Sequence, residues 1–341
     1  MGAVADLSTL RRDRQAVPEP LLDVRDLRAA IGNRVEIGPV TLQVAAGESV
    51  GIVGESGSGK TLLCRTVAGL IGYVGGRMTA GAVSFDGGQL TREGTWPRQV
   101  RQRGIGFVPQ ASQSGLNPVR RVRTHFDDTL RTMGVGSKAA RKAAALELLA
   151  RVRLPDPARV YDAYRHQLSG GMQQRVMIAL ALATEPRLLI ADEPTTALDA
   201  TVQAEILDLV DDLRREAGMA LVVVSHDLNV IGRLCQRTAV MYAGRLVEVG
   251  RTRTLLDAPR HPYTQGLIKS DPLSVSWGTP LVAIPGQPTS PQEWSGDRCN
   301  FAPRCRFAAP GCTVEGPRLE PVDADQSVAC LRWRALAGGA A

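Results

Sequence analysis

The most informative segment of this 341-residue chain reads Gly54-Glu55-Ser56-Gly57-Ser58-Gly59-Lys60-Thr61. It matches the pattern of a phosphate-binding loop, in which glycines let backbone N–H groups turn toward phosphate oxygens. An apolar run at residues 49–53 predicts a strand before the loop, and residues 60–70 have a helical pattern after it. The N-terminus of that helix adds favourable partial charge for an anion. We expect Lys60 to reach the β- and γ-phosphates of a nucleotide, and the Thr61 hydroxyl to bind Mg²⁺.

A second anion site is predicted where the chain reads Leu168-Ser169-Gly170-Gly171-Met172-Gln173-Gln174. Ser169 is a favourable N-cap for the apolar helix that follows, and bare N–H groups at a helix start attract phosphate. An ordinary Ser-capped helix would also explain this stretch taken alone. The stretch resembles the signature motif of the ATP-binding cassette (ABC) family. The resemblance implies a head-to-tail dimer, in which a second subunit's ATP is contacted by Ser169, Gly170, Gly171 and Gln173.

Two further apolar runs end in polar side chains, as expected of buried parallel strands that deliver residues at their carboxyl ends. The run at 187–191 ends at Asp192-Glu193, and the run at 220–224 ends at Ser225-His226-Asp227. Asp192 resembles the family's Walker B aspartate, which holds Mg²⁺. Glu193 then resembles the general base that polarises the attacking water, and His226 the switch histidine that contacts the γ-phosphate.

The remaining family motifs occur in the expected order. Residues 105–110 read as a strand that ends in Gln110, which resembles the Q-loop glutamine and is implied in both catalysis and Mg²⁺ binding. Residues 196–199 resemble the D-loop, whose Asp199 is expected at the dimer interface. Each motif is common alone, but their shared order is specific. One position departs from the family, because Ile31 stands where an aromatic residue often stacks on adenine.

The resemblance covers about residues 21–270 and implies a fold class. That class is an α/β P-loop NTPase fold, the ABC cassette, with a RecA-like core, a β-subdomain and an α-helical subdomain, plus a small Cys-rich C-terminal module. We expect the nucleotide-binding domain at 21–257, with strands of the β-subdomain at 21–54 and 81–86 and the helical subdomain at about 112–184.

The two ends of the chain lie outside that domain. Residues 1–20 are polar and lack the apolar stretch of a signal peptide, so they are predicted to be a disordered tail. Residues 258–341 carry His261-Pro262-Tyr263-Thr264-Gln265-Gly266-Leu267 and, later, Phe301-Ala302-Pro303-Arg304. These segments resemble the C-terminal region of the oligopeptide/dipeptide/nickel branch of importer ATPases.

Four of the six cysteines fall in this C-terminal extension, at Cys299, Cys305, Cys312 and Cys330. Disulfides suit an oxidising compartment better than the reducing cytosol in which a cassette works. Zinc usually binds closely spaced Cys pairs, which are missing here. A four-cysteine iron–sulfur cluster tolerates irregular spacing, and the resemblance implies a [4Fe–4S] centre, with Zn²⁺ and metal-free thiols as alternatives.

Composition limits the class of protein. No segment reaches the roughly 20 apolar residues that a membrane-spanning helix needs. The net charge is +7, with arginines concentrated near Gln110, but aromatic residues make up only 4% of the chain. Single-strand nucleic-acid binders interleave aromatic residues with basic ones, so no nucleic-acid partner is expected.

The resemblance therefore implies an ATP-hydrolysing subunit of a binding-protein-dependent ABC importer, with peptides as the first expectation for the solute. Nickel or oligosaccharide import is the alternative, and ABC ATPases of DNA maintenance or translation are the alternative outside transport. The implied partners are a second ABC ATPase subunit (a paralogue in the peptide branch), two transmembrane permease subunits and an extracytoplasmic solute-binding protein. The implied location is the cytoplasmic face of the bacterial inner membrane.

Overall fold

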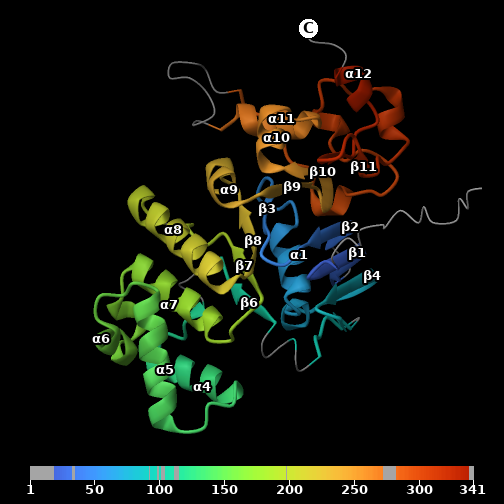
Figure 1. The fold of residues 1–341 in the computed structure, drawn as a ribbon. Coiled ribbons are helices and arrows are strands. Elements are labelled where there is room, and N and C mark those ends of the chain that lie inside the picture. The colour runs from blue at the N-terminus through green and yellow to red at the C-terminus, as the bar shows by residue number, and fades with distance from the viewer. Residues whose placement is uncertain are drawn as a thin grey trace, which may run out of the picture.

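The structure is a computed structural model (Figure 1), which describes residues 19–32, 35–91, 93–97, 100, 104–110, 115–196, 198–271 and 282–337. The tail predicted for residues 1–20 lies outside these ranges, except for its last two residues. No helix in the described part of the chain is long and apolar enough to cross a membrane.

A mixed central sheet carries the predicted motifs and has the strand order β6-β7-β8-β3-β9-β10-β12-β11. Neighbouring strands from β6 to β9 are parallel, and their bounds are β6 (Ile105–Val108), β7 (Leu188–Asp192), β8 (Ala220–Ser225), β3 (Ser49–Val53) and β9 (Arg237–Tyr242). Every residue of β3, β7 and β8 is buried, as expected of parallel strands covered on both faces. The loops after these strands therefore meet at one edge of the sheet.

A second, antiparallel sheet forms the β-subdomain, with the order β2-β1-β4-β5. Its strands are β1 (Leu22–Ile31), β2 (Val35–Val44), β4 (Gly76–Phe85) and β5 (Gly88–Gln89). Helix α1 (Lys60–Val67) contacts β1 and β4 of this sheet and β7 of the central one. The strand expected within residues 21–54 that precedes the phosphate loop is β3, which belongs to the central sheet. Its continuous apolar sequence suits that doubly covered position.

Helices fill the chain between β6 and β7 and gather at one end of the molecule (Figure 1). They are α4 (Val122–Thr132), α5 (Lys138–Arg151), α6 (Pro157–Asp162) and α7 (Gly170–Leu182). Side-chain caps begin the last three, because Ser137, Asp156 and Ser169 each accept a backbone N–H of the first turn. These helices fall within the stretch of about 112–184 that was expected to be helical, of which residues 112–114 lie outside the described ranges.

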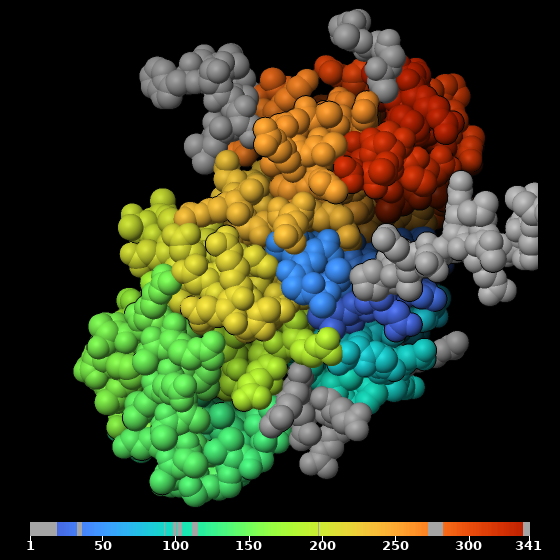
Figure 2. All heavy atoms as spheres, in the orientation of Figure 1, coloured from blue at the N-terminus to red at the C-terminus, as the bar shows by residue number. Residues whose placement is uncertain are grey.

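The C-terminal residues extend the central sheet and pack directly on the core (Figures 1 and 2). After α8 (Ala200–Ala217) and α9 (Leu228–Leu234), the described elements are β10 (Arg245–Arg251), α10 (Thr252–Asp257), α11 (Pro262–Lys269), three short 3₁₀ turns η3 (Pro291–Glu293), η4 (Ala302–Arg304) and η5 (Pro310–Thr313), then β11 (Glu320–Pro321), β12 (Gln326–Val328) and α12 (Trp333–Ala337). Strand β12 pairs antiparallel with β10, so the cassette and the C-terminal part share one sheet.

A buried carboxylate ties these C-terminal elements together. Glu248 on β10 is fully buried and accepts hydrogen bonds from the backbone N–H groups of Arg260 (2.7 Å) and His261 (3.0 Å) and from Nε2 of Gln326 (2.6 Å). Burial raises the pKa of Glu248, and the hydrogen-bond donors around the carboxylate, Thr264 among them, offset part of that effect. One side chain thus fixes the start of α11 and the strand β12 against β10.

We expect Glu248→Ala to lower the free energy of unfolding by about 2–4 kcal/mol, because it leaves buried donors without an acceptor. Urea unfolding of the full chain measures the loss. Glu315→Ala, at an exposed carboxylate of the same C-terminal part, is the control and should change stability by less than about 0.5 kcal/mol. Equal stability of the two variants would contradict the role given to Glu248.

Candidate functional site

The phosphate loop lies between β3 and α1, as predicted. Gly54 has a φ of 155°, and a Cβ there would stand 2.1 Å from the carbonyl oxygen of Met241, so only glycine fits. Helix α1 begins after Gly59, which is left-handed and offers no side-chain cap. The first N–H groups of α1 are therefore left for an anion, which is the arrangement that binds phosphate.

Lys60 is folded back along the loop. Its ammonium donates to the carbonyl oxygens of Gly54 (2.8 Å) and Glu55 (2.9 Å), and burial lowers its pKa. The cation thus lies at the mouth of the loop, where a phosphate can exchange with these carbonyl oxygens. The contact of Lys60 with the β- and γ-phosphates stays a prediction.

Asp192 and Thr61 form a pair suited to a divalent cation. The Thr61 hydroxyl donates to Oδ1 of Asp192 at 3.1 Å, across 131 residues of sequence. The second carboxylate oxygen, Oδ2, is buried and has no hydrogen-bond partner in the described part of the chain. Burial raises the pKa of Asp192, which marks a carboxylate whose charge lacks compensation. A hydroxyl and an uncompensated carboxylate are donors that Mg²⁺ accepts, so these residues fit the predicted ion.

Glu193 contacts side chains from three other predicted motifs. Its Oε2 accepts hydrogen bonds from Gln110 (2.9 Å) and Thr196 (2.9 Å) and lies 3.5 Å from Nδ1 of His226. Burial alone would raise the pKa of Glu193, but the two hydrogen bonds and the nearby His226 outweigh it, so the pKa falls below its usual value. The group is therefore an ionised carboxylate at neutral pH, as a general base must be.

The signature residues divide into two kinds. Ser169 and Gly170 are exposed, Gly171 is half-buried, and the Ser169 side chain accepts the N–H of Met172 at 3.3 Å. Gln173, in contrast, is buried and donates to the carbonyl oxygens of Leu168 (2.9 Å) and Arg165 (3.2 Å). Through these hydrogen bonds Gln173 stabilises the backbone that precedes α7. Figure 1 places α7 among the helices α4–α6, apart from the phosphate loop at the start of α1.

The D-loop lies against the signature helix. Asp199 caps α8 by accepting the N–H of Val202 at 3.0 Å. A Cβ on Gly171 would lie 2.7 Å from the Val202 side chain, so glycine permits the close approach of α7 and α8. Ala197 of the predicted D-loop is outside the described ranges. Ile31, at the expected adenine position, ends β1 and is half-buried.

The four C-terminal cysteines line one pocket, which they share with His261 and Phe301. All four are free thiols, and burial raises the pKa of Cys299 to about 11. Among the residues that the structure describes, no group of three or more His, Cys, Asp or Glu side chains is arranged to hold a metal ion. The iron–sulfur and zinc predictions therefore stay predictions.

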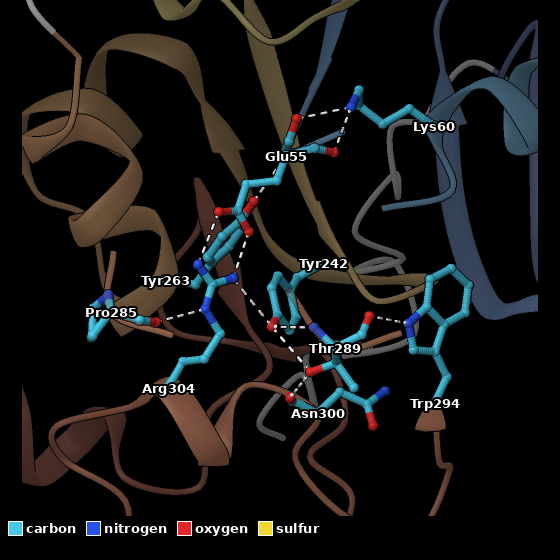
Figure 3. A network of polar contacts seen from close by, with 10 residues as sticks. Glu55, Lys60, Tyr242, Tyr263, Pro285, Thr289, Trp294, Asn300 and Arg304 are labelled. Atoms are coloured by element: carbon cyan, nitrogen blue, oxygen red, sulfur yellow. Dashed lines mark hydrogen bonds and ion pairs between the residues drawn. The ribbon is translucent and has the colours of Figure 1, made fainter. Parts of the chain in front are cut away.

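Two residues that the sequence motifs did not identify touch the phosphate loop (Figure 3). Arg304 forms an ion pair with Glu55, and the hydroxyl of Tyr263 accepts the N–H of Glu55 at 2.7 Å. Both come from segments that the sequence marks only by family resemblance. Nothing in their local pattern indicates a contact more than 200 residues away.

Two family models match the chain. The model described as ABC transporter matches residues 37–196, and the one described as oligopeptide/dipeptide transporter, C-terminal region, matches 247–312. A putative peptide import ATP-binding protein of Brucella melitensis is 40% identical, over 94% of this chain and 99% of its own length. The dipeptide transport ATP-binding protein DppD of Escherichia coli is 41% identical, over 82% of this chain and 85% of its own length.

Solved structures agree on the cassette fold. The ATP-binding cassette MJ0796, described as a dimer bound to ADP and Pi, matches with a TM-score of 0.58 and 31% identity, over 68% of this chain and 99% of that one. Part of the cbiONQ transporter complex, cbiO1 from Clostridium perfringens, has the same fold with a TM-score of 0.58 and 24% identity. With the site geometry and relatives aligned over nearly their full length, the chain belongs to the ATP-binding subunits of the ABC transporter family, in the branch with the oligopeptide/dipeptide transporter C-terminal region.

Proposed function

We propose that this chain is the ATP-hydrolysing subunit of an ABC importer for peptides. The observation that carries the proposal is the convergence of Glu193, Gln110 and His226 next to the Asp192–Thr61 pair and the phosphate loop. Peptides are the favoured solute because the names of relatives aligned along most of the chain describe peptide or dipeptide transport.

The phosphate loop and α1 hold the nucleotide in this proposal. Lys60 and backbone N–H groups of the loop at residues 54–61 bind the β- and γ-phosphates. Thr61 and Asp192 would hold Mg²⁺, with Gln110 as a further ligand. Mg²⁺ held by these residues would neutralise charge that develops on the phosphates during hydrolysis. Ile31 contributes an aliphatic contact to adenine in place of an aromatic one.

Glu193 acts as the general base. Its low pKa keeps the carboxylate ionised, and Gln110 and Thr196 orient the oxygen that would accept a proton from the attacking water. His226, with its side chain largely exposed, contacts the γ-phosphate and keeps Glu193 in place. Hydrolysis thus needs these side chains in one arrangement, which ties the reaction to the positions of both loops.

A second cassette completes the site. The exposed start of α7, at Ser169, Gly170 and Gly171, supplies N–H groups to the γ-phosphate held by the other subunit. Gln173 supports this surface from within, and Asp199 holds the neighbouring start of α8. In the peptide branch the second cassette is a paralogue, so ATP sandwiched between two subunits closes a heterodimer.

Membrane subunits convert closure into transport. We assign their docking to the segment from Gln110 to Arg123, where Val119 is an apolar residue with 80% of its surface exposed. This segment joins Gln110, next to the base, to the helix α4, and its residues 111–114 lie outside the described part of the chain. The further partners are two permease subunits and a solute-binding protein, with the chain at the cytoplasmic face of the membrane.

The four cysteines form a structural metal centre in this proposal, with a [4Fe–4S] cluster as the expected occupant. Its support is the shared pocket of Cys299, Cys305, Cys312 and Cys330 in a part of the chain with little regular structure. Cys299, Cys305, Cys312 and Cys330 would supply the four thiolates, whose irregular sequence spacing suits such a cluster better than a Zn²⁺ site. A bound centre would cross-link these loops.

Glu193→Gln should reduce ATP turnover by about 10²-fold or more and leave ATP binding unchanged, because the amide cannot accept the proton from water. Turnover and peptide uptake are measured on the assembled transporter. The exposed Glu185→Gln is the matched control, with parental values for both. Parental turnover in Glu193→Gln would refute the role of Glu193 as general base. A loss of nickel or sugar uptake, without a loss of peptide uptake, would refute peptides as the transported solute.

Lys60→Ala should weaken ATP binding to the isolated chain about tenfold or more, because it removes the charge that faces the phosphates. Ser169→Arg should leave that binding intact and block dimer closure. Ser137→Arg is its control, since it removes an equivalent helix cap from α5, away from the signature. Nucleotide titration and dimer sizing separate the outcomes, and an equal binding loss in both site variants would contradict a site shared by two subunits.

Protein purified without oxygen should contain about four iron atoms and sulfide per chain. Cys305→Ser should remove the iron, whereas Cys235→Ala, at a buried cysteine in the core, should retain it. Elemental analysis decides between the occupants. Stoichiometric zinc would support the alternative, and a metal-free native chain would refute both.

A further inference from the structure

Arg304 reaches the phosphate loop from the C-terminal part of the chain (Figure 3). Its two terminal nitrogens donate to the two carboxylate oxygens of Glu55, at 2.6 Å and 3.0 Å, in a bidentate ion pair. The Arg304 side chain is only 4% exposed, so water screens this pair weakly. Bidentate geometry fixes the position of the carboxylate as well as its charge.

The backbone of Glu55 also forms hydrogen bonds. The hydroxyl of Tyr263 accepts the Glu55 N–H at 2.7 Å, and Lys60 donates to the Glu55 carbonyl oxygen at 2.9 Å. Tyr263 is completely buried on α11, and burial raises its pKa, so the phenol stays neutral. Glu55 is thus held at its backbone and at its carboxylate, and two of its partners, Tyr263 and Arg304, come from the C-terminal part of the chain.

Arg304 itself is tightly supported. Its Nε donates to the carbonyl oxygen of Pro285 at 2.8 Å, and its guanidinium lies over the rings of Tyr242 and Phe301. The residue ends the turn η4, directly before Cys305. These contacts leave the guanidinium little freedom, and a donor fixed in advance orders the loop at low entropic cost.

The other end of the loop is anchored separately. The N–H of Gly244, in the turn between β9 and β10, donates to the carbonyl oxygen of Ser58 at 2.9 Å. The cassette core therefore holds the end of the loop next to α1, and the C-terminal part holds the end next to β3. Glu55 uses its carboxylate to anchor the loop, and its carbonyl oxygen accepts the N–H of Ser58 at 3.2 Å. The N–H groups at the start of α1 remain for phosphate.

We propose that Arg304 is a positioning residue for ATP, which holds the phosphate loop in its binding conformation through Glu55, with Tyr263 supporting the same residue. The C-terminal part is then a structural component of the ATP site. This inference rests on the proposed function of residues 54–61 as the phosphate-binding loop. The loop contacts the phosphates before and during hydrolysis, so its disorder should weaken ATP binding more than it slows the chemical step.

The test compares ATP KM and kcat in transporters assembled with Arg304→Gln, Arg304→Lys, Glu55→Gln or Glu55→Gln/Arg304→Gln. Arg304→Gln should raise KM about tenfold and change kcat less than about twofold. Arg304→Lys should lose less affinity, because it keeps the charge without the bidentate fork. The KM for ATP of the double variant should be no higher than that of the single variant with the higher KM, because each change removes the same Arg304–Glu55 ion pair.

Arg253→Gln, in an exposed ion pair with Asp257 on α10, is the control for loss of an arginine and should keep the parental KM. A parental KM in Arg304→Gln, or losses that multiply in the double variant, would overturn the proposal. If Arg304→Gln does not fold, Glu55→Gln and Arg304→Lys decide the question in the same way. Lys60→Ala tests the phosphate-binding role of residues 54–61 separately from the role of Arg304, because tight ATP binding in that variant would refute the proposed phosphate loop itself.

Discussion

The parallel pairing of β7, β8 and β3 is the constraint on which the ATP site depends. The register places Asp192 opposite Val224 and Ser225 opposite Val53, so the three strands end side by side. The phosphate loop, the two carboxylates and His226 follow those ends directly. A slip of one residue would move the three strand ends out of line and turn the side chains to the other face of the sheet.

The backbone conformation of Glu193 sets the direction in which its side chain points. Glu193 has a φ of 47°, a left-handed conformation that a glutamate rarely adopts, and its N–H donates to the carbonyl oxygen of Val224 at 3.0 Å. This turn bends the chain at the end of β7, so that Asp192 faces Thr61 while the next side chain faces Gln110 and His226. Such strain persists only where the surrounding structure holds it, and it is concentrated at functional sites.

The residues at the strand ends could be predicted from the sequence because each follows an apolar run and the motifs occur in the order that the family has. Asp192, Glu193 and His226 are of this kind, and the structure brings them together with Gln110. Strand β12 has only three residues and no periodicity, so its place in the sheet was not predictable. The pairing of Arg304 with Glu55 spans 249 residues, and no local pattern encodes a contact between such distant segments.

The sheet also sets the order in which a newly made chain can finish folding. Strand β10 ends at Arg251 and leaves the ribosome well before its antiparallel neighbour β12, which begins only at Gln326. Until then β10 has an open edge, and the buried carboxylate of Glu248 lacks its contact with Gln326. Arg304 likewise arrives late, so the phosphate loop of a nascent chain lacks one of its anchors. Synthesis of residues 304–328 therefore completes both the sheet and the support of the ATP site.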